Sequence, residues 1–151
     1  MAITNSGLFI ATWMDILDTT QLAIDLDLET HKGALFTNTV TPNFSTDTAY
    51  GVAPYNANEI PNGGGYTTGG AVLTGTALTD SPAGTLMWDA ADLAWAASTI
   101  TNARGVLLYA DVLAGDRAIV LVDFDADYST TNGTFTVQWA GTGILTLDLT
   151  P

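Results

Sequence analysis

The last third of the chain alternates apolar and polar positions with the two-residue period of a β-strand. Residues 134–139 read Thr-Phe-Thr-Val-Gln-Trp, which predicts a strand with one buried face. Residues 119–122 read Ile-Val-Leu-Val, and such a continuous apolar run predicts a strand covered on both faces. This part of the chain is therefore predicted to form successive strands at residues 100–110, 118–124, 133–139 and 144–149.

The first part of the chain has the spacing of a helix. Apolar residues recur near helical spacing from position 8 to 17, and Thr4 or Asn5 precedes them as a candidate N-cap, which predicts a short helix ending near Leu17. The apolar positions cover nearly all sides, as they do in buried helices. We expect this helix to pack within its own subunit, with contact to a neighbouring subunit as the alternative. It is too short to span a bilayer.

Short strands separated by turns are predicted in the middle of the chain, at residues 22–28, 32–40, 71–78 and 86–88. A helix tail followed by a turn is the alternative for residues 22–28, and residues 89–95 are predicted as a turn or a single helical turn. About eight strands in total predict an all-β fold, a β-sandwich or a jelly-roll-like barrel. The expected organisation is an N-terminal helical arm, residues 1–20, and a single β-sandwich domain, residues 21–151.

Two segments between the predicted strands are candidate functional loops. Residues 42–61 are polar and long enough to form a surface loop. Residues 62–70 contain five glycines, as phosphate-binding loops often do. A phosphate-binding loop needs a following helix and usually a lysine, whereas a predicted strand without lysine follows here. Residues 62–70 are therefore predicted to form a tight turn.

The charge of the chain excludes some partners. The chain has three lysine and arginine residues in total and sixteen aspartates and glutamates, so the formal net charge is −13. Nucleic acids and anionic membranes are disfavoured, because both are bound mainly through lysine and arginine. The acidity is best explained as a source of solubility. Only 13% of the residues are charged, which favours a surface partly covered by another subunit.

The chain has no cysteine, which excludes disulfides, zinc-thiolate sites and a thiol nucleophile. The N-terminus lacks the basic region of a signal peptide, so the mature chain is expected to begin near Met1.

Asp123, Asp125 and Asp127 are the sharpest candidates for a metal site. Alternating aspartates resemble the start of a calcium-binding loop. The rest of that pattern fails, because Tyr128 stands where glycine is required and Thr134 stands where a bidentate glutamate is required. A solvated strand end and turn is the favoured interpretation, and a weak Ca²⁺ site is the alternative. No other metal or cofactor site is predicted.

Little in the sequence indicates catalysis. His31 is the single histidine, and beside Lys32 it is predicted to lie at the surface or at a strand edge. No Gly-x-Ser-x-Gly motif is present, and no pair of carboxylates stands out. No catalytic residue is therefore predicted, and the chain is not expected to be an enzyme.

Arginine and tryptophan have structural interpretations. Arg104, in the middle of a predicted strand, is expected to form an ion pair within the subunit or across an interface. The four tryptophans are predicted to pack in the core or an interface, with a carbohydrate-binding platform as the alternative. They are Trp13, Trp88, Trp95 and Trp139.

Four segments carry a resemblance to a known family. They are HKGALFTNTVTPNFSTDTAY (31–50), NANEIPNGGGYTTGG (56–70), WDAADLAWAASTITNARGVLLYAD (88–111) and LVDFDADYSTTNGTFTVQWAGTGILTLDL (121–149). Their order resembles a family of small virion structural proteins of tailed bacteriophages that infect actinobacteria. The family pattern has a Lys-x-Ala-Leu strand, an Asn-Glu-Val/Ile turn, a Gly-Tyr-Thr-x-Gly-Gly turn and a Phe-Thr-Ile/Val-Gln-Trp strand. The chain departs from it at Gly33, where a β-branched residue is more common, and in the acidic segment 123–127.

The resemblance implies a non-enzymatic virion component. The expected role is a capsid decoration protein that binds the major capsid protein on the outer surface of the head, as a homotrimer at three-fold positions. The N-terminal arm, residues 1–17, and the loop 42–61 are the expected capsid contacts. A tail- or connector-associated protein of the same family and a carbohydrate-binding β-sandwich module are the alternatives.

Overall fold

The computed structural model describes residues 2–28 and 30–150 and is predominantly β-structure, which confirms the predicted all-β class. Within these residues the strands are β1 (Gly7–Leu8), β2 (His31–Thr37), β3 (Ala71–Val72), β4 (Ala77–Ser81), β5 (Thr85–Asp89), β6 (Leu93–Ser98), β7 (Ala103–Ala110), β8 (Arg117–Tyr128), β9 (Gly133–Val137) and β10 (Leu145–Asp148). One α-helix, α1, spans Ile10–Leu17, and one 3-10 helix, η1, spans Tyr55–Ala57.

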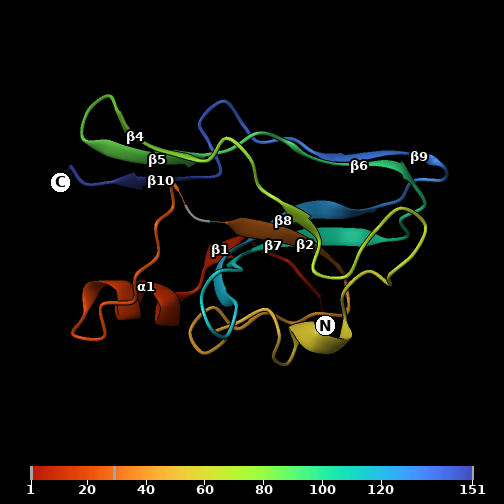
Figure 1. Cartoon of the computed structure of the whole chain (residues 1–151), viewed down its shortest axis with the longest axis horizontal. Coiled ribbons are helices and arrows are strands. Elements are labelled where there is room, and N and C mark those ends of the chain that lie inside the picture. The colour runs from red at the N-terminus through yellow and green to blue at the C-terminus, as the bar shows by residue number, and fades with distance from the viewer. Residues whose placement is uncertain (1, 29, 151) are drawn as a thin grey trace.

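The strands form a sandwich-like arrangement of antiparallel sheets. A five-stranded sheet has the order β1-β8-β7-β2-β3. A three-stranded sheet, β10-β5-β4, and a two-stranded sheet, β6-β9, lie together over one face of it (Figure 1). Helix α1, η1 and the loop 42–61 lie on the opposite face (Figure 1). The five-stranded sheet is therefore the middle layer of the molecule.

The middle sheet is buried on both faces by two separate clusters of apolar side chains. Along β7, Val106 and Leu108 face the cluster beneath the smaller sheets, and Leu107 and Tyr109 face the cluster beneath α1 and the loops. A strand buried on both sides has no polar positions to alternate with, which explains its continuous apolar sequence. The same is true of β8, where residues 119–121 are almost fully buried and Val122 is partly buried, as predicted.

The N-terminal helix differs from its prediction in length and in burial. It begins at Ile10 rather than at Thr4 or Asn5, because Gly7 and Leu8 pair with β8 as a short strand. Thr12 is its only fully buried residue, so the prediction of a buried helix is wrong. The helix has more apolar residues than it has positions facing the protein, so Ile10, Met14 and Leu17 are exposed to solvent.

Residues 22–28 do not form the predicted strand. Burial alternates as predicted from residue 22 to residue 26, with Ile24 and Leu26 packed against the core, but Leu28 is 83% exposed. Asp25 accepts hydrogen bonds from the amides of Asp27 and Leu28, and the backbone turns there instead of pairing. A short polar side chain that bonds nearby amides competes with a strand ladder in this way.

Other boundaries move where the backbone turns. The predicted strand 71–78 is two strands, β3 and β4, separated at Gly75, whose φ is +62°. Strand β6 begins at Leu93, inside the segment predicted as a turn. Strand β7 begins at Ala103 rather than at residue 100, after Asn102 with a φ of 55°. The split of 71–78 and the unpredicted strands β1 and β6 outweigh the loss of a strand at 22–28, so the described residues contain ten strands rather than about eight.

Candidate functional site

Glu59 lies at the centre of a polar cluster, here called the Glu59 cluster, that joins the loop 42–61 to the glycine-rich turn. Its Oε1 accepts hydrogen bonds from the Tyr66 hydroxyl at 2.6 Å and from the Gly69 amide at 2.7 Å. Its Oε2 accepts one from the Tyr50 hydroxyl at 2.5 Å. The Tyr66 hydroxyl also accepts a hydrogen bond from the Leu35 amide in β2. One carboxylate thus ties two loops to the middle sheet.

The tyrosines of the Glu59 cluster are held in their protonated form. Burial, together with the hydrogen bond to Glu59 and its charge, raises the pKa of both Tyr50 and Tyr66 above the usual value for a phenol. Tyr109 stacks on Tyr50 with ring centroids 4.4 Å apart and donates a hydrogen bond to the Gly69 carbonyl. Because both Glu59 oxygens are already engaged, this cluster is suited to holding loops in place rather than to proton transfer.

Glycine is required where the turn meets the sheet. Gly70 has a φ of +74°, and a Cβ atom on it would lie 1.8 Å from the Gly33 carbonyl oxygen. A Cβ on Gly33 would lie 2.4 Å from Leu93 Cδ1. Residues 62–70 form turns, as predicted, and their glycines allow two backbones to approach closely. A larger residue at position 33 would crowd the side chains of Leu93, Leu108 and Val106, which favours glycine there.

The three candidate metal ligands lie near Arg104. Asp123 has a side chain only 3% exposed, and its Oδ1 accepts a hydrogen bond of 2.8 Å from Arg104 Nε. Asp127 Oδ1 lies 3.9 Å from Arg104 Nη1, whereas Asp125 is exposed. Among residues 2–28 and 30–150, no three histidine, aspartate or glutamate side chains are grouped as metal ligands. The guanidinium provides the positive charge, and Arg104 forms the predicted ion pair within the subunit.

A bulge in β8 creates this arrangement. Gly105 pairs with Asp123 and Ala103 pairs with Tyr128, so residues 124–127 all lie opposite Arg104. Asp125 has a φ of 62°, and its amide bonds to Asp123 Oδ1. Asp125 and Asp127 are solvated as expected, but Asp123 is not. The sequence pattern did not reveal the bulge, because aspartate alternates with apolar residues from 123 to 127 with the period of a regular strand.

His31 is fully buried, so its predicted position at the surface or a strand edge is wrong. It pairs with Ala110 in β7, and its ring meets the Trp88 ring edge-on at 5.6 Å. His31 Nε2 lies 2.9 Å from the Asp25 carbonyl oxygen and therefore carries the proton of a hydrogen bond. The Trp88 indole N–H donates to the Leu26 carbonyl. These two hydrogen bonds hold residues 22–28 against the start of β2, where His31 lies.

The tryptophans do not form a shared platform. Trp88 and Trp95 are buried in the core, as predicted. Trp13 of α1 and Trp139, which follows β9, both pack against the cluster that contains Val106 and Leu108, and both are partly exposed. The Trp139 indole N–H donates to the Ala91 carbonyl, which directs its polar edge towards the protein.

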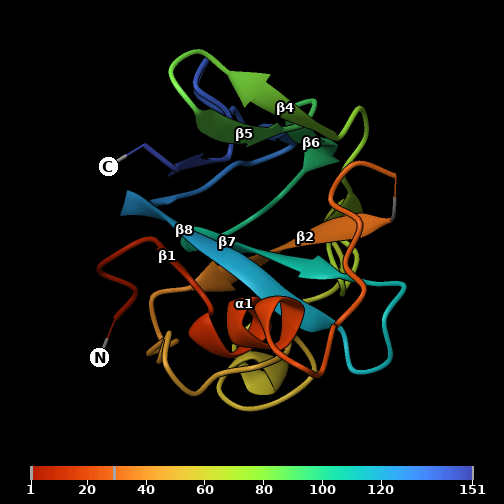
Figure 2. The same ribbon diagram turned by 90° about the vertical axis from the view of Figure 1, so that its left-hand side faces the viewer.

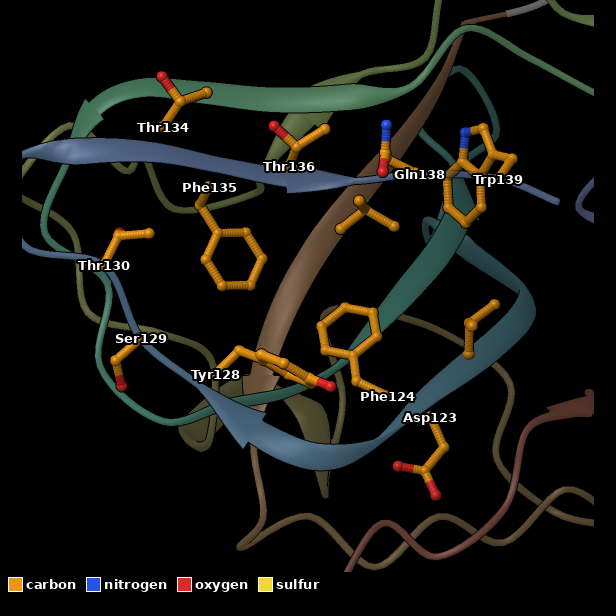
Figure 3. A pocket seen from close by; sticks show the side chains of 12 residues that line it. Asp123, Phe124, Tyr128, Ser129, Thr130, Thr134, Phe135, Thr136, Gln138 and Trp139 are labelled. Carbon is orange, nitrogen blue, oxygen red and sulfur yellow. The ribbon is translucent and has the colours of Figure 1, made fainter.

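A hollow of about 490 Å³ opens between β8 and β9 (Figure 3). Phe124 from β8 and Phe135 from β9 point towards one another across it, with ring centroids 6.3 Å apart. Tyr128, 53% exposed, lies at its mouth, and Asp123 points away from it. Strand β1 pairs with residues 120 and 121 of β8, and residues 122–124 and 128 of β8 line the hollow further along the strand. The hollow offers aromatic walls with hydroxyl groups near the turn, and no reactive constellation.

Neither the Glu59 cluster nor the exposed apolar residues of α1 were predicted from the sequence. The quoted Asn-Glu-Ile and Gly-Tyr-Thr-x-Gly-Gly motifs contain Glu59, Tyr66 and Gly69, and their joint occurrence was the available signal. Among the described residues, no helix has the length and apolar character needed to cross a membrane. Comparison with protein-family models, with curated proteins and with solved structures gives no match.

Proposed function

We propose that this chain is a non-enzymatic structural protein of a bacteriophage virion, and specifically a decoration protein on the outer surface of the capsid. The observation that carries the proposal is the role of the motif residues. Glu59, Tyr66 and Gly69 belong to the segments that resemble the virion family, and all three hold loops to the middle sheet. Motifs used to fix a scaffold suit a protein whose function is to present a rigid surface.

Two further properties support the proposal. The net charge of −13 suits an outer location, away from packaged DNA. Ile10, Met14 and Leu17 of α1 are exposed beside one another, and such apolar surfaces mark contacts with other proteins. The mechanism is mass action: a protein that binds only the assembled shell stabilises that shell against expansion and rupture. The proposed partners are the major capsid protein and, at three-fold positions, two further copies of this chain.

Electron cryomicroscopy of the virions that contain the protein tests this proposal. Density for the β-sandwich on the outside of the head, grouped in threes, is the expected result. Density confined to the tail or the connector contradicts the decoration role and favours the tail-associated alternative. The mass of the purified protein in solution gives a second test, because a trimer is expected and a monomer counts against pre-formed trimers.

A carbohydrate-binding module is the second candidate, and the hollow between β8 and β9 is the observation that favours it. Exposed aromatic rings bind sugar rings through their faces, and Tyr128 stands at the mouth of the hollow. Binding to a glycan array that Tyr128→Ala abolishes is the result this candidate predicts. A glycan signal unchanged by Tyr128→Ala, or no signal, counts against it.

A further inference from the structure

Helix α1 carries its apolar residues on the outside. Ile10, Met14 and Leu17 follow one another at helical spacing, and their side chains are 49%, 59% and 82% exposed. They line a shallow hollow of about 370 Å³ together with Leu8 and Trp13. A helix on the surface of a protein normally turns its apolar stripe towards the core. These three residues are here called the α1 face.

Specific contacts hold the helix in this orientation. The Thr12 hydroxyl is fully buried and donates a hydrogen bond of 2.6 Å to the Ala118 carbonyl of β8. Asp15 forms an ion pair with Arg117, also in β8. Turning the helix to bury Met14 would break both contacts and take the carboxylate partner away from Arg117, whose side chain is only 19% exposed, which is costly. The exposed α1 face is therefore a property of the folded chain.

The α1 face lies at an end of the molecule with other exposed apolar residues. Figures 1 and 2 place α1 and β10 at the same end, on opposite sides of the middle sheet. Leu147 in β10 is 41% exposed and Leu149, just after it, is 61% exposed. Apolar residues gathered at one end of an acidic protein indicate a surface that another protein covers.

The charges indicate what kind of surface covers it. Each lysine and arginine of the chain is already paired with an aspartate of the same chain: Lys32 with Asp111, Arg104 with Asp123, and Arg117 with Asp15. Asp18 remains exposed at the end of α1. A second copy would thus bring acids, and no unpaired lysine or arginine, to the rim of the α1 face. A partner with lysine or arginine around an apolar centre complements it instead.

We infer that the α1 face docks on an apolar protein surface rimmed by lysine and arginine, which in the proposed function is the outer surface of the major capsid protein. This inference rests on the proposed decoration role and names the contact that the role requires. It assigns capsid binding to α1 and leaves any trimer contact to another surface. The loop 42–61 is a weaker contact candidate, because Tyr55 within it is fully buried against the middle sheet.

Co-sedimentation with capsid shells that lack the protein tests the inference. Met14→Asp is expected to weaken binding by about tenfold or more, because it places a charge in the centre of the contact. Val72→Asp is the matched control, because Val72 is 48% exposed and lies on β3, at the edge of the middle sheet opposite β1. The Val72→Asp variant should bind shells like the parent chain. Circular dichroism establishes that both variants are folded.

The salt dependence and Asp18 test the predicted basic rim. Binding of the parent chain should weaken as NaCl rises from about 0.05 to 0.5 M, because salt screens attraction between Asp18 and cations of the shell. Asp18→Asn should bind more weakly and show a smaller salt effect. Binding that is insensitive to both changes contradicts the basic rim.

The outcomes separate the inference from the proposed function. If the parent chain and Met14→Asp bind shells equally well, the assignment to α1 is overturned while the decoration role stands. If the parent chain does not bind shells, both the assignment to α1 and the proposed decoration role are contradicted. If the parent chain forms an oligomer in solution and Met14→Asp dissociates it, the α1 face contacts a second copy and the inference is overturned. Binding of the α1 face to phosphatidylcholine vesicles overturns it as well.

Discussion

The hydroxyl of Tyr66 donates a 2.6 Å hydrogen bond to Glu59 Oε1 and accepts another from the Leu35 amide, so one side chain connects a loop carboxylate to a central strand. Tyr66→Phe should lower the free energy of unfolding by about 1–3 kcal/mol, because it leaves a buried amide and a carboxylate oxygen each short of a partner. Urea denaturation measures this change. Tyr128→Phe, on an exposed ring, should stay within about 0.5 kcal/mol. Equal effects of the two substitutions would contradict the role given to the Glu59 cluster.

Gly70→Ala should destabilise the fold severely, by about 3 kcal/mol or more, because the added Cβ would overlap the Gly33 carbonyl and the φ of +74° disfavours alanine. Gly51→Ala is the control, since its Cβ meets nothing within 4 Å. Thermal unfolding of the two variants gives the comparison. A Gly70→Ala protein as stable as Gly51→Ala would show that the turn does not approach β2 this closely.

Asp123→Asn should cost about 2 kcal/mol of stability, less than a fully buried pair would, because Arg104 is 16% exposed and keeps Asp127 nearby. Asp127→Asn should cost less than about 1 kcal/mol, because the Asp127 side chain is 41% exposed. Chemical denaturation of both variants ranks the two contacts. The reverse order would mean that the ion pair with Asp127 is the stronger one.

Calcium at about 1 mM should leave the melting temperature unchanged, because the Arg104 guanidinium already forms ion pairs with both Asp123 and Asp127. Differential scanning calorimetry with calcium and with a chelator tests this expectation. A calcium-dependent rise in melting temperature that Asp125→Asn removes would establish the alternative Ca²⁺ site.

Alkaline pH should unfold the protein cooperatively. Burial is the leading cause of a raised pKa at Tyr50, Tyr55, Tyr66 and Tyr109. Above about pH 10 these phenols lose protons in the unfolded chain but keep them in the folded chain. The folded state then binds more protons, so stability is complete below about pH 10 and falls as pH rises above it. Tyrosinate absorbance and circular dichroism, followed together, should show that these four tyrosines ionise only as the fold is lost. Ionisation well before unfolding would contradict their burial.

The sequence by itself determined the all-β class and the burial of its strongest strands. The apolar run at residues 119–122 and the alternation at residues 134–137 each reflect a local period of side-chain exposure, and such a period is visible without a structure. Alternation at residues 22–28 also identified Ile24 and Leu26 as side chains that pack against the core, although Leu28, on the same side of the pattern, is 83% exposed. It did not identify a strand, because a strand also needs a partner edge, and the turn formed by Asp25 removes that segment from pairing.

Only the tertiary structure decided which residues act together. Glu59, Tyr66 and Gly69 are brought together by two loops crossing one sheet, and His31 is covered by a segment whose path depends on Trp88. The exposure of Ile10, Met14 and Leu17 likewise follows from the hydrogen bond of Thr12 and the ion pair of Asp15 to β8. Local sequence periods reveal that a helix has an apolar side, but which side faces the protein depends on contacts between residues far apart in the chain.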